Sequence, residues 1–206
     1  PVRVPVNHPP RLLRKLKKLY PWFTDAQLGS RLAALGATHF ERAIAVRQLQ
    51  RKLAKLQTEL NVWSNDEVAM GKLPGWLEEY RAARQTVALR LENCWRHQTF
   101  LPGENGTLMP GLKLDGMRVG SLPVFSGEVD FSHVQRLSLQ NMQLGDDVGY
   151  FLKAFKKLNR LELDGNRITR LPEVPSHMPT QHRLSLRNNA LSLNAQTVQK
   201  LAHMDN

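Results

Sequence analysis

The sequence has little cysteine and no long apolar segment. Cys94 is the one cysteine among 206 residues, which excludes an internal disulfide framework and a cysteine-rich metal site. No apolar run approaches the roughly 20 residues that a membrane-spanning helix needs. The start, PVRVPVNHPPRLLRKLKKL, lacks the apolar core of a signal peptide. Because the chain begins without Met and stops inside a patterned segment, we expect a fragment of a longer protein.

Motifs that carry chemistry are also missing. There is no G-x-S-x-G motif, no phosphate-binding loop and no dinucleotide fingerprint. The histidines fall at positions 8, 39, 97, 133, 177, 182 and 203, without an i, i+4 pair and without Cys or carboxylates at metal-ligand spacing. We therefore expect no cofactor, no metal and no catalytic set in this stretch.

Acidic residues are scarce in the first half of the chain. The net charge is +11, and residues 1–100 carry 17 Lys and Arg against 8 Asp and Glu, whereas residues 101–206 carry 12 against 10. A basic half could bind nucleic acid, anionic lipid or an acidic protein. The alternative is that these basic residues lie on solvated helix faces and bind no partner. The overall composition, 41% hydrophobic and 23% charged, is typical of a soluble globular protein.

The sharpest charged motif is RLLRKLKKL, residues 11–19. At helical spacing its leucines share one face, and the other face carries Arg11, Arg14, Lys15, Lys17 and Lys18. Such a helix could lie on an anionic membrane. It could equally pack its leucines against other helices and leave the cations in water. Nine residues are short for membrane work, so packing is favoured.

A leucine pattern recurs through the second half. Residues 158–168 fit L-x-x-L-x-L-x-x-N-x-L with Leu158, Leu161, Leu163, Asn166 and Ile168. The same frame fits Val134, Leu137, Leu139, Met142 and Leu144, then Gln181, Leu184, Leu186, Asn189 and Leu191, and more weakly Leu112, Leu114, Met117 and Val119. The second leucine of each L-x-L falls at 114, 139, 163 and 186, at intervals of 25, 24 and 23 residues. These intervals are typical of leucine-rich repeats.

The frame has a physical explanation. L-x-L predicts a short strand with both leucines inward, because strand side chains alternate between faces. The asparagine predicts a turn in which a buried amide satisfies backbone groups. Since one coil cannot bury its own apolar face, successive coils must stack into a parallel-stranded solenoid. The return segments predict a helix over 145–159, an extended stretch over 170–181 and a helix over 193–204, with Val198 and Leu201 inward.

The first half is predicted to be helical. T-D-A-Q at 24–27 and T-H-F-E at 38–41 match capping boxes, so we expect helices from there to about Leu35 and Trp63. A seam of Leu49, Leu53, Leu56, Leu60 and Trp63, and a stripe of Trp76, Tyr80, Ala83, Val87, Leu91 and Cys94 or Trp95, predict two long antiparallel helices. We expect Cys94 and the tryptophans at 63, 76 and 95 to be core residues.

The positions that flank the leucines should point outward on the concave face of the strands. They are Arg136, Ser138, Gln140, Arg160, Glu162, Asp164, Arg183, Ser185 and Arg187. Arginine recurs in one register, so strands about 4.8 Å apart would stack three guanidinium groups beside Glu162 and Asp164. The column either binds acidic side chains of a partner protein or consists of ordinary solvent-exposed arginines that bind no partner.

Several stretches together resemble a known family: LENCWRHQ, GLKLDGMRVGSLP, FSHVQRLSLQNMQLGDD and FKKLNRLELDGNRITRLPEVP. They are similar to the segment before and into the repeats of secreted bacterial effectors whose C-terminal domain is a novel-type (IpaH-like) E3 ubiquitin ligase. That ligase uses a cysteine in a Cys-x-Asp motif. Here Cys94 is followed by Trp95 and Arg96, so no catalytic residue carries over.

The expected architecture is α plus α/β solenoid. Residues 1–98 form a basic helical hairpin or bundle that caps the repeats, residues 99–111 form a linker, and residues 112–206 form about four repeats, truncated at the C-terminus. The resemblance implies secretion, action in the host cytoplasm, recognition of a host protein on the concave face, and a downstream ligase that meets ubiquitin-charged E2. The alternative is binding of an anionic membrane or nucleic acid by the basic helices, with structural repeats.

Overall fold

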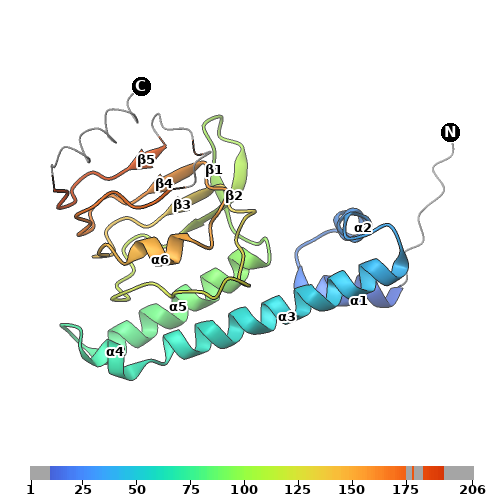
Figure 1. Ribbon diagram of the computed structural model, residues 1–206, viewed down its shortest axis with the longest axis horizontal. Helices are drawn as coiled ribbons and strands as arrows, with labels where there is room; N and C mark the ends of the chain where they lie inside the picture. Colours follow the sequence, from blue (N-terminus) through green and yellow to red (C-terminus); the bar gives the residue numbers. More distant parts are fainter. Residues whose placement is uncertain (1–9, 175–177, 179–182, 193–206) are drawn as a thin grey trace.

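The computed structural model describes residues 10–174, 178 and 183–192, so the helix expected over 193–204 lies outside the described residues. A block built on a small sheet is joined to a protruding arm of helices (Figure 1). The arm contains α1, α2 and the first half of α3, and the second half of α3 runs back under the block beside α5. The helices are α1 (Pro10–Leu19), α2 (Asp25–Ala34), α3 (His39–Ser64), α4 (Glu67–Gly71), α5 (Leu77–Trp95) and α6 (Val148–Leu152).

Both predicted N-caps are present. The Thr24 side chain accepts a hydrogen bond from the Gln27 backbone N–H, and the Gln27 side chain closes the capping box at the start of α2. The Thr38 hydroxyl accepts from the Glu41 N–H at the start of α3. The Glu41 carboxylate instead accepts from the Ala37 N–H at 2.8 Å, so this second box is open. The caps fix both helix starts at the predicted residues.

The leucines of α1 are packed inside the arm. Leu12, Leu16 and Leu19 are buried, and α1 packs against both α2 and α3. The basic residues of α1 therefore remain on its outer side. The packing alternative for residues 11–19 is the one that the structure adopts.

The long helices α3 and α5 run antiparallel, with α4 at their turn (Figure 1). Leu53, Leu56 and Leu60 of α3 are buried, as are Val87 and Leu91 of α5. The core prediction holds for Trp95, which is buried, and in part for Trp63, which is half-buried and donates its Nε1–H to the Ser121 carbonyl at 3.0 Å. It is wrong for Trp76, which is 77% exposed at the N-cap of α5, beyond the stretch where α3 covers that helix.

An arginine that the sequence analysis did not identify attaches α5 to the block. Arg84 is only 2% exposed, although the apolar stripe of α5 suggested no charge there. Its Nε donates to the Val119 carbonyl at 2.9 Å and its Nη1 to the Trp63 carbonyl at 2.7 Å, and its guanidinium lies over the Trp63 ring. These bonds tie both long helices to the loop after the first parallel strand.

The segment expected as a linker, residues 99–111, forms most of a β-hairpin. Strand β1 (Phe100–Pro102) pairs antiparallel with the start of β2 (Leu108–Lys113). Prolines interrupt a ladder because they lack an N–H, yet Pro102 lies in the edge strand β1, and the Pro110 carbonyl accepts from the Gln135 N–H. The Gly- and Pro-rich composition therefore marks a tight turn and an edge rather than a flexible connection.

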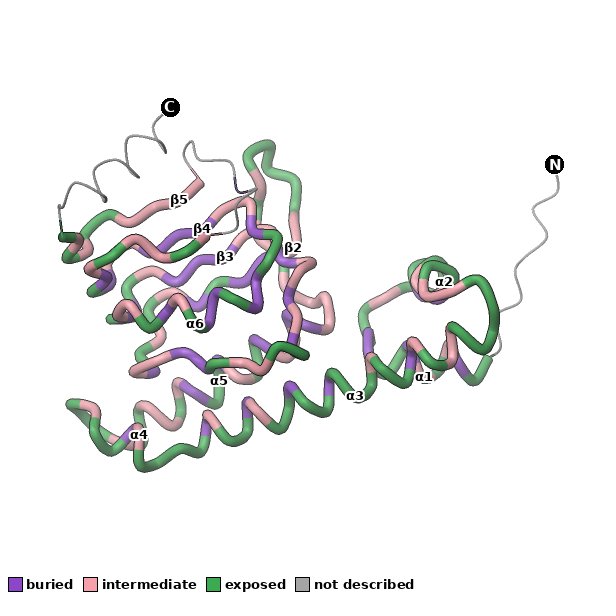
Figure 2. The backbone as a smooth tube through the Cα atoms, viewed as in Figure 1, coloured by how far each residue is buried: buried purple, intermediate pink, exposed green. Residues whose placement is uncertain are grey.

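The remaining strands are β3 (Arg136–Ser138), β4 (Arg160–Glu162) and β5 (Leu184–Ser185). The sheet order is β1-β2-β3-β4-β5, and β2 to β5 pair in parallel. Leu112, Leu137 and Leu161 are register partners and are buried. Buried residues concentrate on β3, β4 and the segments under them (Figure 2).

Each of the parallel strands, β2 to β5, is followed by a turn with the same backbone conformation. Two residues after the second leucine of each L-x-L, the chain adopts a positive φ, at Gly116 (76°), Asn141 (55°), Gly165 (71°) and Asn188 (56°). Glycine and asparagine tolerate this left-handed conformation best. At Gly165 a Cβ would lie 2.0 Å from the Asn141 Oδ1, so this position also requires glycine because of the close approach of the preceding turn.

The predicted asparagine turn is present. The Asn166 Nδ2 donates to the carbonyls of Leu139 and Leu163 at 2.7 and 2.9 Å, and its Oδ1 accepts from the N–H groups of Met142 and Leu144, both at 3.0 Å. Asn189 repeats the arrangement one strand on, with bonds to Leu163 and Leu186. A buried amide thus satisfies backbone groups of two successive strand–turn segments.

The return segment 145–159 is less helical than predicted. Only Val148–Leu152 forms α6. Phe151, Phe155 and Leu158 are buried as expected, but the chain turns after Leu152. The Ala154 carbonyl accepts a hydrogen bond from the Phe131 N–H at 2.9 Å, so it bonds to an earlier segment of the chain and not within a helix. The described parts of the predicted extended stretch, 170–174 and 178, have no helix or strand.

Candidate protein-binding surface

Polar side chains from successive strands line up in register. Arg136 is the partner of Arg160, while Ser138 is the partner of Glu162 and Glu162 of Ser185. Because the alternating leucines point inward, these side chains share the opposite face of the parallel strands. We name this the strand face; it comprises Arg136, Ser138, Gln140, Arg160, Glu162, Asp164, Arg183, Ser185 and Arg187.

The arginine column is neutralised within the protein. Glu162, which is buried, lies 2.8 Å from Arg136 Nη2 and 2.9 Å from Arg160 Nε. Arg183 Nη2 lies 3.2 Å from Glu104 in the hairpin turn. The carboxylates remove most of the repulsion that three neighbouring cations would cause. Within the described residues Arg160 uses only its Nε, so both its Nη groups remain for a partner.

Aspartates form a second row along the strand face. Asp115 Oδ1 accepts from the Ser138 hydroxyl at 2.7 Å and the Gln140 N–H at 2.9 Å. Asp164 repeats this with Ser185 and the Arg187 N–H, at 2.5 and 2.9 Å. Asp164 therefore organises the next turn, whereas Glu162 pairs with the arginine column. The side chains are held by hydrogen bonds, which makes the face rigid.

The hairpin forms a rim beside this face. Arg136 Nη1 donates to the Pro102 carbonyl at 2.7 Å, and Glu104 reaches Arg183. The hairpin carries two exposed apolar side chains, Phe100 and Leu108. By the alternation of β2, Leu108 shares the side of the sheet that carries the buried Leu112, so these two apolar side chains lie on the side opposite the strand face.

The basic residues of α1 lie elsewhere. Arg11, Arg14, Lys17 and Lys18 are exposed and Lys15 is half-buried, all on the arm and away from the strands. Lys17 Nζ donates to the Phe23 carbonyl at 2.7 Å. The two sets of predicted contact residues are thus separate surfaces.

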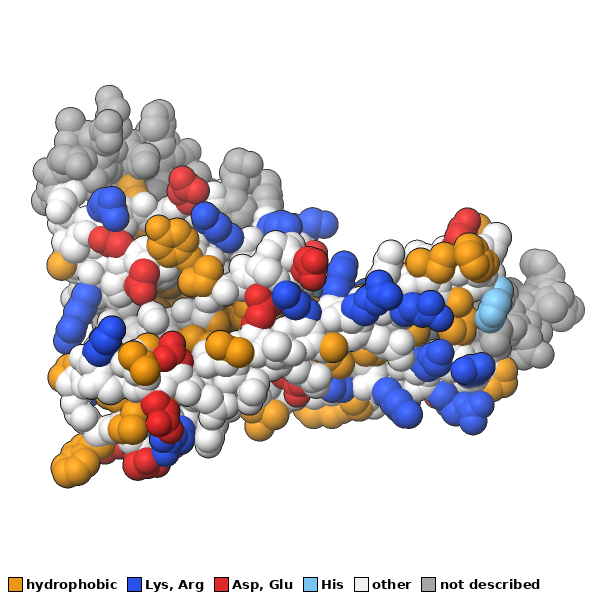
Figure 3. Space-filling view, turned by 60° about the horizontal axis from the view of Figure 1, so that its bottom comes forward, with side chains coloured by type: hydrophobic (Ala, Val, Ile, Leu, Met, Phe, Trp, Pro, Cys, Tyr) orange, Lys and Arg blue, Asp and Glu red, His pale blue; other side chains and the backbone are white. Residues whose placement is uncertain are grey.

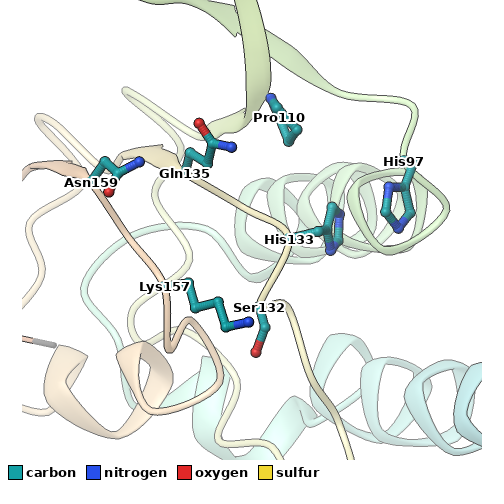
Figure 4. Close-up of a pocket in the computed structure, with 7 residues that line it drawn as sticks. All are labelled: His97, Pro110, Ser132, His133, Gln135, Lys157 and Asn159. Carbon is teal, nitrogen blue, oxygen red and sulfur yellow. The ribbon is translucent and has the colours of Figure 1, made fainter. Parts of the chain in front are cut away.

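A polar hollow of about 620 Å³ lies where the starts of β3 and β4 meet the end of α5. Figure 4 shows Lys157 pointing toward Ser132, with Gln135 and Asn159 on one side and the two imidazoles of His97 and His133 on the other. The rings stack with centroids 3.8 Å apart, and His133 Nε2 lies 2.7 Å from the Cys94 carbonyl, which requires that it donate. Sequence spacing gave no sign of this pair.

Burial keeps these imidazoles and the thiol neutral. Burial, followed by the neighbouring His133 and Arg31, lowers the pKa of His97 to about 3. Burial also lowers the pKa of His133. Burial raises the pKa of the Cys94 thiol to about 12, so Cys94 is the inert core residue that its position predicted.

The described residues offer neither a metal-binding cluster nor a membrane-spanning helix. They contain no group of three or more His, Cys, Asp or Glu side chains that could hold a metal ion. None of the helices described in the chain combines the length and the apolar content needed to cross a bilayer.

Comparison with models of protein families, with curated proteins and with solved structures found no match to this chain.

The structure adds residues to the predicted surface. Glu104 and Asp115 hold strand-face side chains but were not predicted, since neither lies in the L-x-L segments. Asp115 follows the second leucine of its strand as Asp164 does, so the repeat frame contained a usable signal. No pattern in the sequence indicated Glu104, because its partner Arg183 lies far along the chain, directly before β5.

Proposed function

We propose that residues 112–192 belong to a leucine-rich-repeat solenoid, that α3 and α5 cap its first coil, and that its strand face recognises another protein. The spacing of the L-x-L segments, the register of Leu112, Leu137 and Leu161, and the recurring asparagine turns support the architecture. The position of α5 beside β2 supports the cap.

The observation that carries the binding proposal is the ordered strand face. Its side chains come from successive strands at a fixed spacing and are held by Glu162, Asp115 and Asp164. A preorganised surface loses little side-chain entropy on binding. Arg160 offers unpaired Nη groups to a carboxylate.

The test compares two charge reversals on the same repeats. A partner is first isolated with the wild-type protein, and its affinity is then measured with Arg160→Glu and with Arg167→Glu. Arg167 is exposed on the turn after β4 rather than on the strand. We expect Arg160→Glu to weaken binding at least tenfold, about 1.4 kcal/mol, and Arg167→Glu to leave it within about twofold. Equal affinities for the three proteins would remove the strand face as the binding surface.

The resemblance to secreted effectors supports a wider proposal. In it, the strand face selects a host protein for a ubiquitin ligase in the same polypeptide, and the protein acts in the host cytoplasm. With ubiquitin-charged E2, the full-length protein should modify the isolated partner. Arg160→Glu should abolish that modification and leave self-modification intact. Absence of any ubiquitin transfer would remove the ligase proposal while leaving protein recognition to the affinity test.

A further inference from the structure

The arm concentrates positive charge that the rest of the protein does not balance. Between residues 10 and 58, which cover the arm and the next two turns of α3, the acidic residues are only Asp25 and Glu41. The cations are Arg11, Arg14, Lys15, Lys17, Lys18, Arg31, Arg42, Arg47, Arg51, Lys52 and Lys55. None of the ion pairs among the described residues involves these cations. Figure 3 shows Lys and Arg side chains gathered along the arm, with hydrophobic side chains near its outer end.

One stripe of α3 combines these cations with exposed apolar residues. Residues 40, 44, 47, 51 and 55 follow spacings of 4, 3, 4 and 4, which keeps them on one side of a helix with 3.6 residues per turn. The side chains are Phe40, Ile44, Arg47, Arg51 and Lys55, and all are exposed, Phe40 by 72%. The opposite side of α3 carries its buried residues, such as Val46 and Leu53. The stripe is straight and about 22 Å long at 1.5 Å per residue.

The structure also restricts how the arm can meet a membrane. An amphipathic helix normally places its apolar face in the lipid, but Leu12, Leu16 and Leu19 of α1 are buried inside the arm. Insertion of α1 would therefore require the arm to unfold. Contact by the folded arm must use side chains that are already exposed, which include most of these cations together with Phe40, Ile44 and Trp22 in the α1–α2 loop.

We propose that the arm is a peripheral docking surface for an anionic lipid bilayer, with the α3 stripe lying along the membrane. Arg47, Arg51 and Lys55 contact lipid phosphates, while Phe40 and Ile44 enter the interfacial layer. A nucleic acid would satisfy the cations through its phosphates but gives no role to the exposed apolar end of the stripe. The proposal does not depend on the strand face, which the arm leaves uncovered (Figure 1).

Vesicle sedimentation tests the electrostatic part. The protein should bind vesicles of phosphatidylcholine mixed with phosphatidylserine and not vesicles of phosphatidylcholine alone, and salt should weaken binding. Each basic residue near an anionic surface is worth a factor of roughly five. The triple variant Arg47→Gln, Arg51→Gln and Lys55→Gln should therefore bind on the order of a hundredfold more weakly.

A matched control removes the same charge from exposed positions outside the arm: Lys72→Gln, Arg118→Gln and Lys156→Gln. The control should retain affinity within about threefold, and circular dichroism should show both triple variants folded. Equal losses in the two triple variants would mean that net charge and not the α3 stripe drives binding, and would overturn the proposal. Binding to phosphatidylcholine alone would do the same.

The apolar end of the stripe separates a membrane from a nucleic acid. Phe40→Ser with Ile44→Ser should weaken vesicle binding at least tenfold, while Val68→Ser with Val124→Ser, also exposed, should not. Binding of a single-stranded RNA oligonucleotide should be weaker than vesicle binding. Tighter RNA binding that needs Arg47, Arg51 and Lys55 but not Phe40 would assign the surface to nucleic acid and refute the proposal.

Discussion

Asn166 gives the most direct test of how successive strand–turn segments are held together. Its side chain makes four hydrogen bonds to backbone groups from a site that is only 6% exposed. Asn166→Ala removes them all. The Leu163 carbonyl keeps a partner, the Nδ2 of Asn189 at 2.9 Å. The N–H groups of Met142 and Leu144 and the Leu139 carbonyl lose theirs.

The expected loss follows from these three buried groups. Each unsatisfied buried donor or acceptor costs about 1–3 kcal/mol. Water that enters the space left by the amide would relieve part of this, so we expect Asn166→Ala to lower the free energy of unfolding by about 3–5 kcal/mol. Total stabilities of about 5–15 kcal/mol are ordinary for a domain, so the variant should remain measurable.

Asn189→Ala is the matched control. Asn189 makes the same kind of bonds, to the Leu163 and Leu186 carbonyls and from the Ile168 N–H, but it is half-buried. Because water can replace its amide, the loss should be about 1 kcal/mol. Urea unfolding followed by circular dichroism gives both values. A loss below about 1 kcal/mol for Asn166→Ala, or equal losses for the two variants, would refute the argument that a buried amide holds adjacent strand–turn segments together.

Three other predictions concern groups buried between the helices and the block. Arg84→Lys should lower the free energy of unfolding by about 2 kcal/mol and by more than Arg84→Met does. The lysine keeps a buried charge but loses the two hydrogen bonds to the Val119 and Trp63 carbonyls. Urea unfolding of both variants measures the two losses, and a larger loss for Arg84→Met would contradict this prediction. The Cys94 thiol, with a pKa of about 12, should resist a disulfide reagent at pH 8 and react once denaturant unfolds the chain; rapid labelling of the folded protein would contradict its burial. The pKa of His97 is lowered to about 3, so unfolding lets this imidazole take up a proton below its ordinary value of about 6.5. Its stabilising contribution is therefore present above about pH 6.5 and is lost as pH falls toward 3, with a slope of up to about 1.4 kcal/mol per pH unit. His97→Asn, which suits the positive φ of 59° at this position, should flatten the profile; an unchanged slope would assign the pH dependence to other groups.

Local patterns explain which features could be predicted. The caps at Thr24 and Thr38, the buried Cys94 and the hydrogen bonds of Asn166 each depend on residues close in sequence or on one repeated frame. Such features follow from helix and strand periodicity and from the donors and acceptors of a few side chains. They could be derived without knowing where the rest of the chain lies.

Several errors have a common origin in contacts between distant segments. The stretch 99–111 was predicted to be a linker, but its hairpin is held by the Arg136 contact with the Pro102 carbonyl and the Gln135 contact with Pro110. Trp76 was predicted to be buried, but α3 does not cover that end of α5. The partners of Arg183 and His97, which are Glu104 and His133, lie far from them in sequence.

The sequence by itself determined where α2 and α3 begin, which leucines face inward and where the chain must turn after them, because those properties follow from the spacing of side chains along a backbone of fixed geometry. Only the tertiary structure decided that the leucines of α1 are buried inside the arm, that Glu162 neutralises two arginines and that Arg84 is buried. Each of these depends on which surfaces meet across the fold, and the free energy of a charge is set by what lies within a few ångströms of it.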